Sequence, residues 1–152
     1  MIARDDLSLE LTPLGYLRWY IHPDIPDVVD RCLYSFELEI PTGSRSGRLQ
    51  HQGGIVHLVI EGQGHTILGS DRHDWEALDV IAIPPQPDGV VFQHFNDGVS
   101  TARLLLVFPN YDTSLGPELG AAMDVVDPAP EYRLTTSGGG ELREDGPSPT
   151  VL

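Results

Sequence analysis

The chain has 152 residues, of which 40% are hydrophobic and 21% charged, and a formal net charge of −14. This composition predicts a single soluble globular domain that is long enough to bury a sizeable core. The negative charge repels nucleic acid and anionic membrane surfaces, and no apolar run is long enough to cross a bilayer. We therefore expect the partner to be a small-molecule substrate or another copy of the chain.

The N-terminus and the single cysteine predict a cytoplasmic protein. Residues 1–6 lack a basic region followed by an apolar one, so they do not predict a signal peptide. Cys32 has no second cysteine to pair with, which agrees with a reducing compartment. The segment around it, residues 31–36, is typical of a largely apolar strand, so we expect a buried structural thiol.

Short strand-like segments separated by turns follow one another along the chain. Its 16 glycines and 13 prolines favour many short strands over a helical bundle. We expect strands at residues 7–12, 15–22, 32–40, 65–68, 80–83, 90–95 and 102–108, and one on either side of Gly53-Gly54. We expect a short helix at 117–123 and a single domain over 1–134, followed by a flexible tail at 135–152. About ten short strands predict an all-β antiparallel sandwich or small barrel.

The stretch from residue 47 to residue 96 carries the residues best suited to chemistry. Residues 47–64 predict a strand, a glycine turn, a second strand and a second glycine turn. Five of the six histidines fall between positions 51 and 94, namely His51, His57, His65, His73 and His94. The sequence has no Gly-rich phosphate loop, no Cys-x-x-Cys and no nucleophile-elbow serine. Nucleotide hydrolysis, thiol redox and serine-hydrolase chemistry therefore have no support.

Three motifs in this stretch resemble those of a known family. Residues 61–64 (Glu-Gly-Gln-Gly) predict a glycine turn, residues 79–85 predict a strand that enters a proline turn, and Asn96 follows. Their order resembles the two sequence motifs of the cupin superfamily, over about residues 32–108. The resemblance implies an all-β fold, a double-stranded β-helix or jelly-roll barrel. Leu78 stands where the turn of that family usually has a glycine.

The chain departs from the family at the metal-ligand positions. His51 stands at the second histidine of the family's His-x-His, but Leu49 occupies the first. Only Gly54 and Ile55 stand near the expected glutamate, and Phe92 takes the place of the second motif's histidine. Only one of the usual ligands is kept in register, so the resemblance is stronger for the fold than for an activity.

Strand alternation indicates that other histidines replace the missing ligands. Because residues two apart on a strand share a face, His57 and His94 should point into the barrel. A hairpin about Gly53-Gly54 would place His57 across from Leu49. The imidazoles of His51, His57 and His94 predict a displaced site for a divalent metal ion, Fe, Zn, Ni or Cu. The alternative is that they are pocket or core histidines, hydrogen-bonded to their neighbours.

The other candidates are Glu61 and the three remaining histidines. Glu61 shares the strand parity of His57 and is a candidate catalytic general base, but its place beside a turn is also typical of a solvated carboxylate. We expect His65 at the mouth of the barrel, and His22 and His73 on the surface or in loops.

Two functions follow from these features. The first is a metal-dependent enzyme acting on a small organic substrate inside the barrel; the resemblance implies a dioxygenase, or a cyclase or isomerase. Leu49, Ile55 and Phe92 would then form an apolar wall around the metal. The alternative is a metal-free cupin that serves as a small-molecule binding or structural module.

The outward positions of the strand after Gly53-Gly54 predict an apolar surface outside the barrel. Val56, Leu58 and Ile60 are apolar and should face away from the barrel. They would allow a homodimer, unless the N-terminal strands cover them.

Overall fold

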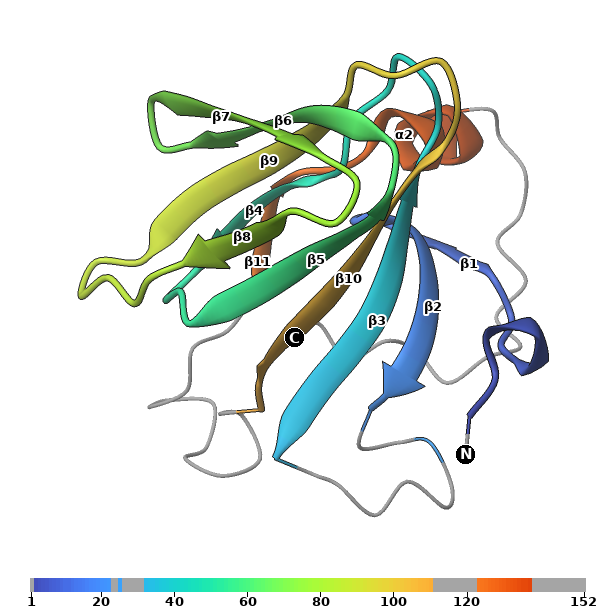
Figure 1. The fold of residues 1–152 in the computed structure, drawn as a ribbon, viewed down its shortest axis with the longest axis horizontal. Coiled ribbons are helices and arrows are strands. Elements are labelled where there is room, and N and C mark those ends of the chain that lie inside the picture. Colours follow the sequence, from blue (N-terminus) through green and yellow to red (C-terminus); the bar gives the residue numbers. More distant parts are fainter. Residues whose placement is uncertain (1, 23–24, 26–31, 111–122, 138–152) are drawn as a thin grey trace.

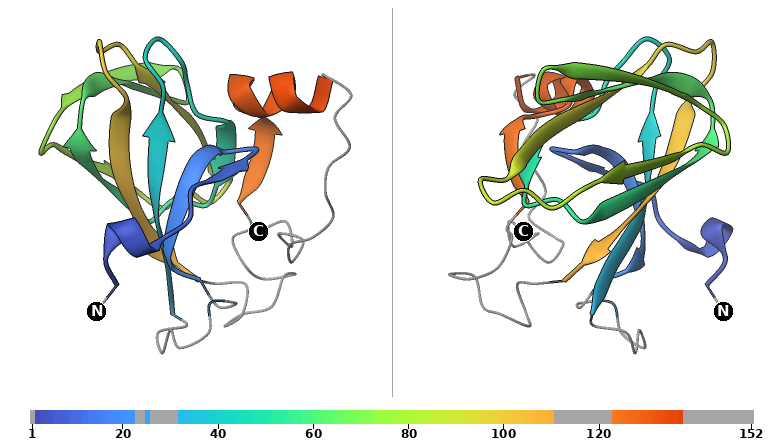
Figure 2. Two further views of the ribbon diagram at one scale, coloured as in Figure 1. Left: turned by 90° about the vertical axis from the view of Figure 1, so that its right-hand side faces the viewer. Right: turned by 60° about the vertical axis from the view of Figure 1, so that its left-hand side comes forward.

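The structure is a computed structural model that describes residues 2–22, 25, 32–110 and 123–137 (Figure 1). The first sheet has the order β1-β2-β3-β10-β5-β8, formed by β1 (Glu10–Thr12), β2 (Gly15–Ile21), β3 (Leu33–Ile40), β10 (Ala102–Pro109), β5 (Ile55–Glu61) and β8 (Val80–Ile83). The second has the order β11-β4-β9-β6-β7, formed by β11 (Asp124–Asp127), β4 (Arg48–His51), β9 (Val90–Asn96), β6 (Gln63–Leu68) and β7 (Asp71–Glu76). The two sheets curve around one interior (Figure 2), which confirms the predicted jelly-roll barrel.

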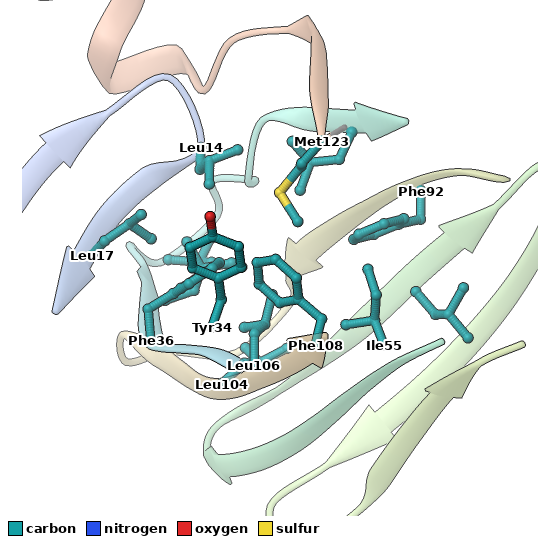
Figure 3. Packing of buried hydrophobic residues seen from close by; sticks show 14 of the residues in the cluster. Leu14, Leu17, Tyr34, Phe36, Ile55, Phe92, Leu104, Leu106, Phe108 and Met123 are labelled. Carbon is teal, nitrogen blue, oxygen red and sulfur yellow. The ribbon is translucent and has the colours of Figure 1, made fainter. Parts of the chain in front are cut away.

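The core forms because inward and outward residues alternate along the strands. In β10, Leu104, Leu106 and Phe108 are buried, whereas the residues between them are partly exposed. Figure 3 shows these side chains packed together with Phe36 from β3, and with Phe92 from the opposite sheet farther along the same interior. Each fully buried side chain of this kind contributes about 1.5–3 kcal/mol, so the pattern stabilises the closed barrel.

The chain crosses from the second sheet to the first at Gly53-Gly54. Both glycines have positive φ, +92° and +73°, and a Cβ on Gly53 would lie 2.2 Å from the carbonyl oxygen of Pro84. Glycine is therefore required for the close approach at this crossing. The predicted hairpin is wrong, because β4 and β5 belong to opposite sheets and His57 does not pair with Leu49.

The sequence pattern does not predict four of the described elements: the 3-10 helix η1 (Arg4–Asp6), β7, β11 and the short helix α2 (Pro130–Ser137). The helix η1 precedes β1. The helix α2 continues three residues past the expected start of the tail at residue 135. Of the helix expected at 117–123, only Met123 lies within the described residues, and it is not helical. No described helix has the length and apolar character needed to cross a membrane.

Two expectations about exposure have opposite outcomes. Cys32 is exposed, which corrects the expected buried thiol; β3 begins one residue later, so its alternating burial does not reach the sulfur. Val56 and Leu58 face outward as predicted and are 47% and 36% exposed. The N-terminal strands β1 and β2 do not cover them, because they extend the sheet beyond β3. The homodimer stays a prediction.

Candidate functional site

Three histidines from three strands lie inside the barrel, and we call them the interior histidine cluster. His51 on β4, His57 on β5 and His94 on β9 are 2%, 0% and 0% exposed. The first and last come from the second sheet and His57 from the first, so the cluster spans the interior between the sheets. The inward direction expected from strand alternation is therefore observed for all three side chains.

The rings of His57 and His94 lie close together. Their centroids are 4.7 Å apart with the planes at 76°, an edge-to-face arrangement. The ring of Phe92 lies 5.6 Å from His57 and 5.5 Å from His94. Leu49 and Ile55 are also buried, each 1% exposed, so the residues at the family's ligand positions give the interior an apolar lining.

Three buried nitrogen atoms of this pair have no hydrogen-bond partner among the described residues. They are Nδ1 and Nε2 of His57 and Nε2 of His94. Leaving a buried polar group unpaired costs about 1–3 kcal/mol, and such groups in native proteins call for an explanation such as a bound water, ion or ligand. The pair is therefore the part of the interior best suited to receive another molecule.

Burial keeps these two imidazoles neutral. Burial, followed by the neighbouring His94 and His51, holds the pKa of His57 well below its usual value. Burial also lowers the pKa of His94 to about 3. Both rings are consequently uncharged at neutral pH, and each offers one N–H donor and one lone pair.

His94 is held by a buried hydrogen-bond chain that begins at Trp75. The indole Nε1 of Trp75 donates to Oγ1 of Thr66 over 3.1 Å, and this oxygen lies 2.7 Å from Nδ1 of His94. Thr66 and His94 are cross-strand partners in the β6–β9 ladder, so the backbone register sets this contact. Neither Thr66 nor Trp75 was singled out by the sequence motifs; the available signal was a polar residue at an inward position of β6.

The cluster does not fit the predicted three-histidine metal site as it stands. The backbone N–H of Gly53 donates to Nδ1 of His51 over 3.0 Å, so the neutral ring of His51 carries its proton on Nε2. A metal-bound imidazole nitrogen must instead offer a lone pair. Among the described residues, no group of three or more histidine, cysteine, aspartate or glutamate side chains is arranged to hold a metal ion. Metal binding therefore stays a prediction.

Glu61 lies outside the barrel. In the β10–β5 ladder Arg103 pairs with Glu61 and Leu104 with Val59, so a bulge at Ile60 reverses the alternation. The Glu61 side chain is 55% exposed, and its Oε2 lies 3.2 Å from Nη1 of Arg103. The expectation that it shares a face with His57 is therefore corrected, and it does not contact the interior histidine cluster.

The remaining histidines have separate surroundings. The ring of His65 stacks on Phe95 with centroids 4.6 Å apart, and its Nδ1 lies 2.6 Å from Oδ2 of Asp97. His73 is exposed on β7, and His22 packs against Trp19 at 4.8 Å. None of these three belongs to the interior cluster.

A pocket of about 260 Å³ lies where the free edges of the two sheets, β7 and β8, approach each other. We call it the seam pocket; it is lined by Thr66, Leu68, His73, Asp74, Trp75, Asp79, Val80, Ile81, Ala82 and Ile83. Thr66 thus contacts both this pocket and His94, and Ile81 is the ladder partner of His57. One layer of side chains therefore separates the seam pocket from the histidine pair.

Solved structures of similar fold include a cupin barrel. The polyketide cyclase RemF from Streptomyces resistomycificus matches with a TM-score of 0.60 and 21% identity over 72% of this chain and 78% of that one. A cupin 2 conserved barrel domain protein from Salinispora arenicola matches with a TM-score of 0.56 and 18% identity, over 70% and 85% of the two chains. The chain thus has the fold of the cupin superfamily, as the sequence motifs imply.

An aromatic-ring dioxygenase shows the same fold at lower identity. Salicylate 1,2-dioxygenase from Pseudoaminobacter salicylatoxidans, described in adducts with gentisate, matches with a TM-score of 0.61 and 14% identity over 80% of this chain. The match spans 31% of the dioxygenase chain. No family model matches the sequence, and no curated protein matches it significantly.

Proposed function

We propose that the protein is a small-molecule cupin that binds an organic compound at His57 and His94 without a metal ion. The observation that supports this most is the set of three unpaired nitrogens on two neutral, fully buried rings. A bound molecule would pair these atoms and remove the cost of burying them unpaired. The apolar lining would strengthen each hydrogen bond, because the local dielectric is low.

The pKa values favour binding or polarisation of a ligand over proton abstraction by these rings. A general base works best when its pKa lies near the working pH. The pKa of His94 is lowered to about 3 by burial, so its ring is a weak base at neutral pH. We therefore propose that the pair holds and orients its ligand, and that any turnover depends on polarising a bound group.

A second candidate is the metal-dependent enzyme, a dioxygenase or a cyclase or isomerase. It is favoured by the neutral state of His57, whose ring nitrogens have no partner among the described residues, since metals bind imidazole through an unprotonated nitrogen. It would require His51 to give up the hydrogen bond from Gly53. The similar folds of a polyketide cyclase and a salicylate dioxygenase make both reaction types worth testing.

Elemental analysis and thermal unfolding separate the two candidates. Protein purified without an affinity tag should contain no stoichiometric metal, and its midpoint should be unchanged by a chelator. In a thermal-shift screen of small organic compounds, a compound that stabilises the wild type should lose its effect in His57→Leu. It should keep its effect in His65→Leu, which removes a buried histidine whose ring nitrogen already has a partner. Stoichiometric metal that disappears in His57→Leu would establish the second candidate instead.

A further inference from the structure

The hydrogen-bond chain at Thr66 assigns the proton of His94. A threonine hydroxyl has one hydrogen and two lone pairs, and the indole N–H of Trp75 is a donor only, so it occupies a lone pair of Oγ1. Thr66 is 1% exposed, and within the described residues the other polar atom at hydrogen-bond distance from Oγ1 is Nδ1 of His94. If that nitrogen also donated, the hydroxyl hydrogen would be buried without an acceptor. Thr66 therefore donates to Nδ1 of His94.

This assignment places the ring hydrogen of His94 on Nε2. A neutral imidazole whose Nδ1 accepts a hydrogen bond carries its proton on the other nitrogen. The same reasoning gives His51 an Nε2–H, because the backbone N–H of Gly53 donates to its Nδ1. Nε2 of His94 is buried and has no partner in the described part of the chain. The interior thus presents a fixed, unpaired N–H donor.

The N–H donor of His94 determines which chemical group of a ligand can pair with it. An N–H donor pairs with an oxygen or nitrogen acceptor, and His57 supplies a further N–H from one of its two unpaired nitrogens. Both rings are neutral and lie against Phe92, so they offer no positive charge to offset a buried carboxylate. The net charge of −14 also opposes the approach of an anion. A neutral carbonyl oxygen meets these conditions.

The volume of the seam pocket indicates what size of ligand the protein could accept. The pocket's volume is about 260 Å³ and its lining is mixed, with apolar Leu68, Trp75, Ile81 and Ile83 beside polar Thr66, His73, Asp74 and Asp79. An apolar cavity of about 150 Å³ is enough for a benzene ring. The pocket is therefore large enough for one ring with a short substituent, and Thr66 lies between it and His94.

We propose that the site takes a small, uncharged carbonyl compound whose oxygen accepts the N–H of His94, and that Thr66 is the positioning residue that keeps this nitrogen a donor. The proposal rests on the proposed function, since it names the class of ligand for the same pair of histidines. In this arrangement the indole N–H of Trp75 occupies one lone pair of the Thr66 hydroxyl.

The tautomer is tested first, without any ligand. Long-range ¹H–¹⁵N spectra of histidine-labelled protein should show His94 and His51 as Nε2–H tautomers at neutral pH. Thr66→Val, which removes the hydroxyl at nearly constant volume, should shift His94 toward the Nδ1–H form, and Thr66→Ser should restore the wild-type spectrum. An Nδ1–H tautomer of His94 in the wild type would overturn the proposal.

The ligand class is tested with acetophenone and ethylbenzene, which have similar shape and differ in the carbonyl oxygen. Titrations followed by NMR should show acetophenone binding at least about tenfold more tightly, and this preference should disappear in Thr66→Val and return in Thr66→Ser. Equal binding of both probes, or tighter binding of benzoate, would overturn the carbonyl assignment and leave small-molecule binding intact. Binding of none of the probes overturns it too, and stoichiometric metal in the purified protein would remove the proposed function as well.

Discussion

Two buried polar clusters lie on opposite sides of the same sheet and are built in opposite ways. On the outer face of β3, the side chain of Glu37 is 0% exposed and is paired with Arg4 at 2.8 Å and with Arg103 at 2.9 Å. Inside the barrel, His57 is also 0% exposed, yet neither of its ring nitrogens has a partner in the described residues. The outer cluster pairs its buried carboxylate, whereas inside the barrel the ring nitrogens of His57 are left unpaired by the described residues.

The pKa values follow from this difference. Burial alone would raise the pKa of Glu37, but the hydrogen bonds and charges of Arg103 and Arg4 outweigh it and hold the pKa below its usual value. At His57 and His94 no carboxylate among the described residues offsets burial, so the neutral form is favoured. A paired cluster stabilises the fold, whereas an unpaired one lowers stability and is available to a ligand.

The largest expected effect comes from breaking the outer cluster. Glu37→Ala should lower the free energy of unfolding by about 3 kcal/mol, because Arg103 and Arg4 lose their buried counter-ion. Urea unfolding at neutral pH measures this loss. Glu61→Ala is the matched control: its carboxylate also pairs with Arg103 but is 55% exposed, so the loss should stay below about 1 kcal/mol. Equal losses in the two variants would contradict the idea that burial makes the Glu37 ion pairs more important than that of Glu61.

Acid should weaken the interior cluster. The unfolded chain takes up protons on histidine below pH 6.5, whereas the lowered pKa values of His57 and His94 keep the folded rings neutral to lower pH. Stability should therefore fall below pH 6.5 by up to about 1.4 kcal/mol per pH unit for each ring, and for His94 this loss continues to about pH 3. Urea unfolding between pH 6.5 and 4.5 should therefore show a smaller slope in His57→Leu than in the wild type. Identical slopes would show that His57 is not buried in its neutral form.

At pH 7.5 the same substitution should already stabilise the protein. His57→Leu replaces an unpaired buried ring by a hydrocarbon of similar size, so the free energy of unfolding should rise by about 1 kcal/mol. Ligand stabilisation should be lost at the same time. A destabilisation as large as that of Glu37→Ala would indicate that the ring nitrogens are paired in the folded protein.

The smallest effect is expected at the turn before β8. Leu78 has a φ of +77° and is 79% exposed, so it adopts a left-handed conformation without burying its side chain. Leu78→Gly should therefore stabilise the protein by about 0.5 kcal/mol, with little change in ligand binding. Leu78→Ala is the control, since it shortens the side chain and keeps the strained backbone. Thermal unfolding of the two variants separates these causes.

Local pattern was sufficient for most of the fold. The expected strand at 80–83 has the bounds of β8, and the strand expected at 102–108 is one residue shorter than β10. The strand β7 could not be predicted, because all of its residues except Trp75 are exposed and it lacks apolar alternation. The crossing at Gly53-Gly54 was not predicted either, since paired glycines also suit a hairpin. Only the long-range register decides which sheet receives the next strand.

The sequence was sufficient to predict which histidine side chains point into the barrel, but not which residues they contact. Alternation placed His57 and His94 in the interior. It did not reveal Thr66, whose contact with His94 depends on a ladder between residues 28 apart in sequence. It also failed at Glu61, because a single bulge reverses the parity of the strand end. The burial of Glu37 was not predictable either. Its side chain points to the outer face of β3, but Arg4 and Arg103, which are distant in sequence, cover it.

The free edge of the second sheet has a consequence for the protein in concentrated solution. Every exposed residue of β7 is charged or a histidine, and Arg72 forms ion pairs with Asp74 and Asp97. Side chains of this kind disfavour the addition of a foreign strand, which is how exposed sheet edges seed aggregates. The edge strand β7 can therefore stay exposed without favouring edge-to-edge polymerisation.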